Sequence, residues 1–250
     1  MQLNVLTYNI HKGFTSFNRK FVLEELKEAL RSTHADLALL QEVIGDNSDH
    51  KKKIDAWPTR PQFEFLADQV WGHYAYARNA VYPRGHHGNV ILSKFPILSY
   101  DQENLSTNSM EHRGLLHCVV EVPAARQKLH LMCLHLGLTQ RGRNQQLDQL
   151  SRRIGRLPLD EPVIVGGDFN DWRNRVSPVL LERHGLREAH VTAHGKKART
   201  FPIKLPLFAV DRIYFRGLEL KAATVLGKGV FRELSDHAAV MATLTLKPKG

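Results

Sequence analysis

The stretch VIVGGDFND, Val163 to Asp171, joins an apolar run to a cluster of acidic and amide side chains. Its apolar half is typical of a buried strand, and the Gly166–Gly167 pair permits a sharp turn or close approach to a ligand. In an extended chain Asp168 and Asn170 point to the same side. The stretch therefore predicts a buried strand that presents an acceptor and an amide to one substrate atom. A turn held by Asx hydrogen bonds is the alternative interpretation.

Strand and helix signals alternate along the 250 residues, which predicts one α/β domain over residues 1–250 with a mixed sheet content. Apolar runs predict strands at 2–10, 36–43, 88–98, 112–122, 128–138, 162–171, 209–217, 220–226 and 237–246. Helical spacing of apolar residues predicts helices at 18–32, 62–71, 144–154 and 178–185. The polar segment 45–62 contains Pro58 and Pro61 and predicts a surface loop.

Composition limits the classes of function. Hydrophobic residues make up 42% and charged residues 24%, a globular balance, and the formal net charge of +10 favours polyanionic partners such as nucleic acid or anionic headgroups. Two cysteines, Cys118 and Cys133, lie in apolar runs and predict buried free thiols. No stretch approaches ~18 apolar residues and the first residues do not resemble a secretory signal, so we expect a cytoplasmic protein.

Several apolar strands end in polar residues, and this recurrence indicates a site. The polar residues at these strand ends are Asn9, His11, Glu42, His135, Asp168, Asn170, Asp211, Ser235, Asp236 and His237. Because unpaired carboxylates are costly to bury, converging strand ends would need a shared hard divalent cation with oxygen ligands. The acidic stretch at Asp168 lacks the later ligands of a calcium loop, and Ser235, Asp236 and His237 are adjacent and cannot meet as a hydrolase triad.

These segments resemble the endonuclease/exonuclease/phosphatase superfamily of metal-dependent phosphoester hydrolases. The matching elements are TYNIH, LLQEV, GNVILSKFPI, HRGLLHCVVEV, LHLMCLHLG, VGGDFND, VDRIY and SDHAAV, in the order of the family and from Leu3 to Val240. The resemblance implies a four-layered α/β sandwich, in which two mixed β-sheets pack face to face with helices outside, and a Mg²⁺ or Mn²⁺ cofactor.

The resemblance also implies roles for single residues. Glu42 would be the main metal ligand, with Asn9 and Asp236 beside the ion. Asp168 and Asn170 would position or activate the attacking water, and His237, oriented by Asp211, would be the acid/base or phosphate-stabilising group. His135 and Arg113 would contact the phosphate, as would Asn9. Either Asp168 or His237 could be the general base. His11 stands where AP endonucleases have an acidic residue, which argues against abasic-site cleavage.

The leading hypothesis is a phosphodiesterase or nuclease that uses metal-activated water. A phosphatase or phosphodiesterase acting on a phospholipid headgroup or a soluble phosphorylated metabolite is the first alternative, because a fold does not decide the substrate. A non-catalytic nucleic-acid-binding module is the alternative from another class. The basic run His50 to Lys53 could approach a DNA or RNA backbone or a membrane surface, or be a solvated charge run.

Overall fold

The computed structural model describes residues 1–109 and 111–247, and its strands form two mixed sheets. The first sheet has the strand order β11-β12-β1-β2-β4-β3. Its strands are β1 (Gln2–Asn9), β2 (Leu37–Asn47), β3 (His73–Tyr82), β4 (Gly85–Ser93), β11 (Glu219–Leu226) and β12 (Ala239–Thr245). The second has the order β5-β6-β7-β8-β10-β9. Its strands are β5 (Ile97–Asn104), β6 (Gly114–Val122), β7 (Gln127–His135), β8 (Val163–Asp168), β9 (Arg187–Glu188) and β10 (Asp211–Arg216).

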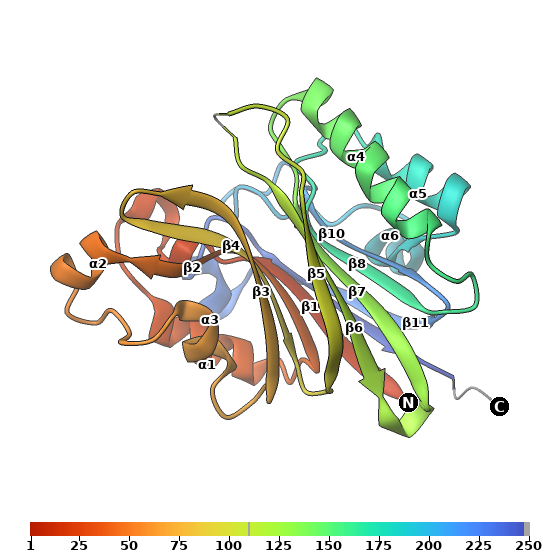
Figure 1. The fold of residues 1–250 in the computed structure, drawn as a ribbon, viewed down its shortest axis with the longest axis horizontal. Helices are drawn as coiled ribbons and strands as arrows, with labels where there is room; N and C mark the ends of the chain where they lie inside the picture. The colour runs from red at the N-terminus through yellow and green to blue at the C-terminus, as the bar shows by residue number, and fades with distance from the viewer. Residues whose placement is uncertain (110, 248–250) are drawn as a thin grey trace.

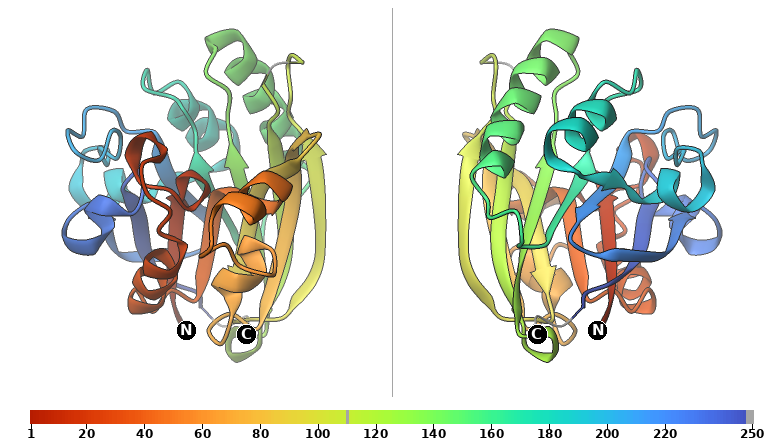
Figure 2. Two further views of the ribbon diagram at one scale, coloured as in Figure 1. Left: turned by 90° about the vertical axis from the view of Figure 1, so that its left-hand side faces the viewer. Right: turned by 90° about the vertical axis from the view of Figure 1, so that its right-hand side faces the viewer.

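The helices lie outside the two sheets (Figures 1 and 2). They are α1 (Leu23–Ser32), α2 (Ser48–Lys53), α3 (Gln62–Ala67), α4 (Gln140–Gly155), α5 (Val176–His184) and α6 (Ala189–His194). Three apolar cores separate the layers. One fills the space between the sheets, one lies under α1 and α3, and one lies under α4 and α5. The four-layered α/β sandwich is therefore confirmed.

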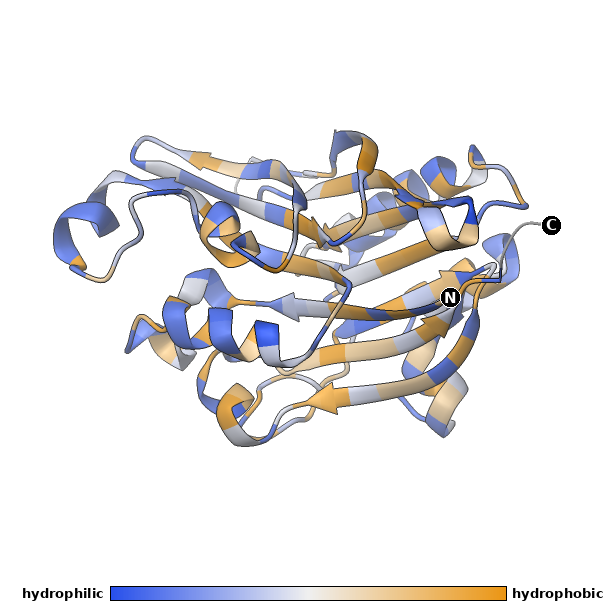
Figure 3. Cartoon of the chain, turned by 90° about the horizontal axis from the view of Figure 1, so that it is seen from below, coloured by the Kyte–Doolittle hydropathy of each residue, from blue (hydrophilic) through white to orange (hydrophobic). Residues whose placement is uncertain are grey.

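Alternation of side chains explains this layering. Along β1, Leu3 and Val5 enter the core between the sheets, whereas Leu6 and Tyr8 enter the core beneath α1. Figure 3 shows apolar residues, in orange, interspersed with polar ones along the strands. Cys118 and Cys133 are buried free thiols in the core between the sheets, as the sequence predicted.

Each sheet has one parallel pair at its centre, and these pairs place the site. β1 and β2 run parallel in the first sheet, and β7 and β8 run parallel in the second. The carboxyl ends of parallel strands lie at the same edge of a sheet. At these ends Asn9 is the register partner of Gln41, and His135 is the register partner of Asp168. The edge of the first sheet that carries Asn9 and the edge of the second sheet that carries His135 and Asp168 line one pocket.

The structure corrects several sequence-based boundaries. Residues 88–98 are not one strand, because the chain turns after Ser93 and divides into β4 of one sheet and β5 of the other. The edge strand β3 was missed. Part of the predicted loop 45–62 is regular, since β2 continues to Asn47, whose side chain accepts hydrogen bonds from the first turn of α2. Helix α1 begins at Leu23, five residues after the predicted start.

No helix in the described residues has both the length and the apolar character needed to cross a membrane. The described helix with the most residues, α4, carries charged and amide side chains along its outer face.

Candidate active site

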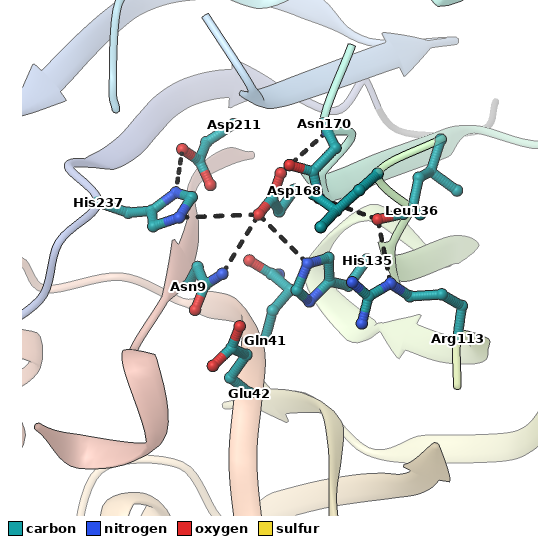
Figure 4. Close-up of polar contacts among 12 residues, drawn as sticks. Asn9, Gln41, Glu42, Arg113, His135, Leu136, Asp168, Asn170, Asp211 and His237 are labelled. Carbon is teal, nitrogen blue, oxygen red and sulfur yellow. Dashed lines mark hydrogen bonds and ion pairs between the residues drawn. The ribbon is translucent and has the colours of Figure 1, made fainter. Parts of the chain in front are cut away.

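A pocket of about 440 Å³ lies at the edge where the two sheets meet. Eight of the nine residues that the sequence singled out for catalysis, phosphate or metal line this pocket: Asn9, Glu42, Arg113, His135, Asp168, Asn170, Asp236 and His237. The ninth, Asp211, is fully buried and bonds His237 from behind the pocket wall. The structure thus brings all nine together from strands β1, β2, β7, β8 and β10, from the turn after β8, and from the segments just before β6 and β12. Figure 4 labels all of them except Asp236.

Asp168, the last residue of β8, lies at the centre of this group. Its Oδ2 accepts a hydrogen bond of 3.2 Å from the side-chain amide of Asn9. The Nε2 atoms of His135 and His237 lie 3.4 Å and 3.8 Å from the same oxygen. Burial, together with the field of Asp211, raises the pKa of Asp168 to about 6, although His237 opposes the rise. A carboxylate so surrounded is held in one orientation and faces the pocket.

His237 has one ring nitrogen fixed and one directed to the pocket. Its Nδ1 is 2.9 Å from Oδ2 of Asp211, a contact that sets the ring orientation, so Nε2 points toward Asp168. Burial alone would lower the pKa of His237, but the carboxylates of Asp211, Asp168 and Asp236 outweigh burial and raise it to about 10. The imidazole is therefore protonated near neutral pH and presents a positively charged N–H donor.

Asn170 combines the two interpretations that the sequence left open. Its backbone N–H donates to Oδ1 of Asp168 at 3.0 Å, which is an Asx turn, and its φ of 47° is left-handed. Its side-chain amide lines the pocket while donating to the carbonyl of Leu136 at 2.9 Å. The turn therefore places the amide in the pocket. The extended geometry predicted for this pair is wrong, because the chain bends at Phe169–Asn170.

Glu42 enters the pocket from the opposite sheet through a distortion in β2. The register between β2 and β4 shifts between Leu40 and Val43, and Glu42 has a left-handed φ of 57°. Its Oε2 is buried without a hydrogen-bond donor in the described part of the chain, and the Lys12 ammonium lies 3.3 Å away. Burial would raise the pKa of Glu42, but coulombic interactions with the basic side chains of His135, Lys12 and His11 lower it to about 2. The carboxylate is ionised and has an oxygen available to a cation.

These features fit a hard divalent ion. Glu42 offers Oε2, which accepts no hydrogen bond in the described structure and has the Lys12 ammonium beside it, while Asp236 and Asn9 line the same pocket and add oxygen atoms. Asp168, Asp211 and His237 also place ligand atoms within 4.8 Å of one another. That cluster is less suitable, because His237 and Asp211 already bond each other directly.

The remaining pocket residues supply positive charge and apolar walls. Arg113 lines the pocket while its Nε donates to the carbonyl of Leu136 at 3.1 Å and its Nη2 pairs with Glu111 at 3.0 Å. Burial and the nearby Arg113 lower the pKa of His135, so its imidazole is neutral. Trp172, Phe201 and Phe208 form the apolar wall.

Sequence reasoning missed Lys12 and this aromatic wall. Lys12 stands only three residues after Asn9, and Trp172 directly follows the VIVGGDFND stretch, so proximity to the motifs was the available signal. Phe201 and Phe208 lie in a segment without any motif. Only the fold brings them to the pocket.

Comparison with known proteins agrees with this geometry. A sequence model described as the Endonuclease/Exonuclease/phosphatase family matches residues 6–237. An Escherichia coli (strain K12) protein described as uncharacterized protein YbhP is 47% identical over 97% of this chain and 96% of its own length.

Solved structures show the same fold at low sequence identity. An endonuclease/exonuclease/phosphatase from Beutenbergia cavernae superposes with a TM-score of 0.81 at 20% identity, covering 98% of this chain and 72% of that one. The mannosyl-6-phosphatase Bt3783 of Bacteroides thetaiotaomicron superposes with a TM-score of 0.75 at 17% identity, covering 98% of this chain and all of that one.

Proposed function

Since the chain belongs to the endonuclease/exonuclease/phosphatase family, we propose that it is a divalent-metal-dependent phosphodiesterase that uses water as the nucleophile. The observation that carries this proposal is the position of Asp168. Its Oδ2 lies within 3.2–3.8 Å of side-chain nitrogen atoms of Asn9, His135 and His237, inside a pocket that also contains Glu42. Phosphoryl transfer needs little covalent chemistry from a protein beyond such positioning and charge neutralisation.

Glu42, Asp236 and Asn9 would hold the Mg²⁺ or Mn²⁺ ion. When bound, the ion neutralises phosphate charge and polarises a phosphoryl oxygen. A phosphate would otherwise be repelled by the carboxylates of Glu42, Asp168 and Asp236 that line the pocket.

The side chains of the pocket would activate the water, donate a proton and bind the phosphate. Asp168 would orient the attacking water and accept its proton, because its Oδ2 faces the pocket centre. His237 would donate Nε2–H to the phosphate or to the departing oxygen, while Asp211 positions its ring through Nδ1. The amide of Asn170 would fix the water beside Asp168. His135 and Arg113 would bind the phosphate oxygens.

Hydrolysis of bis-p-nitrophenyl phosphate tests this assignment. Wild-type protein should turn over this diester with Mg²⁺ or Mn²⁺ and not with EDTA. Asp168→Asn and His237→Ala should each lower kcat by about 10³-fold or more, and Asp211→Asn by a smaller factor, because it disturbs only the orientation of His237. His73→Ala, on the exposed part of β3, serves as the matched control and should retain full activity.

Parallel measurements separate the competing functions. Preference for p-nitrophenyl phosphate over the diester would favour a phosphatase acting on a phosphorylated metabolite. Metal-independent affinity for DNA or RNA, without turnover of any ester by folded protein, would overturn the proposal in favour of a binding module.

A further inference from the structure

A second and larger groove, of about 770 Å³, adjoins the catalytic pocket. Trp172 and Phe208 line both, so the two cavities share one wall. We call the second cavity the basic groove, because Lys196, Lys197 and Arg199 line it and none of its described lining residues is acidic. All three cations are exposed, and in the described structure none of them forms an ion pair. They are therefore available to an anion.

The basic groove is fixed to the catalytic residues by the backbone that follows it. Thr200, next to Arg199, is buried, and its Oγ1 accepts a hydrogen bond of 3.3 Å from the N–H of Asp211. The carbonyl of Thr200 accepts another from the N–H of Ala238, beside His237. The ring of Phe201 then lies 4.7 Å from the ring of His237. Thr200 and Phe201 thus connect the three cations of the basic groove to Asp211 and His237.

The shared wall is aromatic and partly open to solvent. Trp172 and Phe208 are 44% and 42% exposed, and their ring centroids are 6.1 Å apart. The guanidinium of Arg143 lies 4.8 Å from the Trp172 ring centroid and helps to hold that ring in place. Exposed aromatic faces beside a row of cations match a substrate in which a planar ring and a second negative charge follow the scissile phosphate.

From this arrangement we propose that the basic groove is a second anion site, which binds a phosphate neighbouring the scissile one while a planar ring of the substrate lies on Trp172 and Phe208. The substrate is then a phosphodiester with at least two phosphates flanking a ring, as in a short single-stranded polynucleotide. This inference rests on the proposed phosphodiesterase activity and adds the substrate class to it.

Two chromogenic diesters that differ by one phosphate test the proposal. They are the p-nitrophenyl ester of thymidine 5′-phosphate and the same ester with an additional 3′-phosphate. In wild-type protein the 3′-phosphate should raise kcat/KM by about tenfold or more. In the variant Lys196→Ala/Lys197→Ala/Arg199→Ala that ratio should fall close to one. A control that removes three exposed cations at the opposite end of the sheets, Lys128→Ala/Arg156→Ala/Lys247→Ala, should keep the wild-type ratio.

A binding measurement distinguishes failure of this inference from failure of the proposed activity. Wild-type protein should bind thymidine 3′,5′-bisphosphate about tenfold more tightly than thymidine 5′-phosphate, and the triple variant at the groove should bind both alike. Turnover of both esters with equal kcat/KM in wild type would overturn the second anion site while leaving the activity intact. Loss of binding to phosphatidylglycerol vesicles in the groove variant, with unchanged ratios on the nucleotides, would also overturn it and assign the groove to a lipid surface.

Discussion

Three acidic or amide residues of VIVGGDFND have different environments although they are close neighbours in sequence. Asp168 and Asn170 line the pocket, but Asp171 turns away and pairs with the buried Arg212 at 3.1 Å. Asp171 also accepts hydrogen bonds from the backbone N–H groups of Arg175 and Val176, where α5 begins. The polar residues at the end of β8 therefore include two that line the pocket, Asp168 and Asn170, and one structural carboxylate, Asp171.

His117, a buried histidine outside the catalytic pocket, should make the stability of the folded protein sensitive to acid. His117 bonds His130 on β7 at 2.9 Å, accepts from Arg153 on α4 through Nδ1, and lies near Asp101 on β5. Burial, together with the charges of His130 and Arg153, lowers the pKa of His117 to about 4. In the unfolded chain His117 has a pKa near 6.5, so as the pH falls below this value it is protonated in the unfolded chain before it is protonated in the folded one. The folded state should therefore lose stability as pH falls from about 6.5 to 4, by on the order of 3 kcal/mol from this group.

Urea unfolding at pH 7 and pH 4.5 measures this effect. His117→Gln should show a smaller loss of unfolding free energy between the two pH values than wild type. His73→Gln makes the same chemical change at an exposed position of β3 and should leave the loss unaltered. Equal pH dependence in wild type and His117→Gln would contradict the assignment.

At the scale of elements, irregularities in two central strands shape the site. The register shift in β2 allows Glu42 to leave the regular alternation and reach the pocket. In β8, Gly167 pairs with Leu134 of β7, and a Cβ on Gly167 would lie 2.0 Å from the Leu134 carbonyl oxygen. The second glycine of the opening stretch thus permits close packing of the parallel pair that carries His135 and Asp168.

We expect Gly167→Ala to destabilise the protein by about 3 kcal/mol or more, because the clash is with backbone that cannot move aside without separating β7 from β8. Thermal unfolding measures this change. Gly72→Ala is the matched control, since a Cβ there meets no atom within 4 Å, and its effect should stay within about 0.5 kcal/mol. A Gly167→Ala variant as stable as Gly72→Ala would show that the strand pair can relax.

For the whole molecule, charge is distributed unevenly. The formal net charge is +10, yet the catalytic pocket contains the carboxylates of Glu42, Asp168 and Asp236, with Asp211 behind them. The basic groove beside it contains cations without acidic neighbours in its lining. This separation suits the proposed metal ion in the catalytic pocket and the proposed second phosphate in the basic groove.

A divalent ion that binds the folded protein should therefore raise its melting temperature. At a free Mn²⁺ concentration about 100-fold above Kd the gain is about 2.7 kcal/mol, or roughly 5–10 °C for a chain of this size. Glu42→Gln should lose most of this shift, because it removes the charge of the proposed main ligand. Glu121→Gln, an exposed change on β6, should retain it. An equal Mn²⁺ shift in wild type and Glu42→Gln would exclude Glu42 as the main ligand.

The amino-acid sequence by itself determined the alternation of strands and helices and the central buried strands, and it predicted nine site residues that the structure brings close together. Periodicity and polar strand ends are local properties, and the ordered motifs from Leu3 to Val240 relate them to a family whose fold the structure confirms. The roles of those residues remain predictions. Strand β3, the division of 88–98 between two sheets, and the bend at Asn170 depended on contacts between distant segments, which no local pattern records.

Only the tertiary structure decided which cavities exist and what lines them. Lys12 reaches Glu42 through the fold of the loop after β1, and Phe208 meets Trp172 across a gap of 36 positions in the chain. Lys196, Lys197 and Arg199 are an unremarkable charge run in the sequence, and they become a candidate anion site only because Thr200 and Phe201 attach them to Asp211 and His237. The physical reason is that burial and charge pairing depend on the whole set of neighbours, which the chain acquires only when both sheets are packed together.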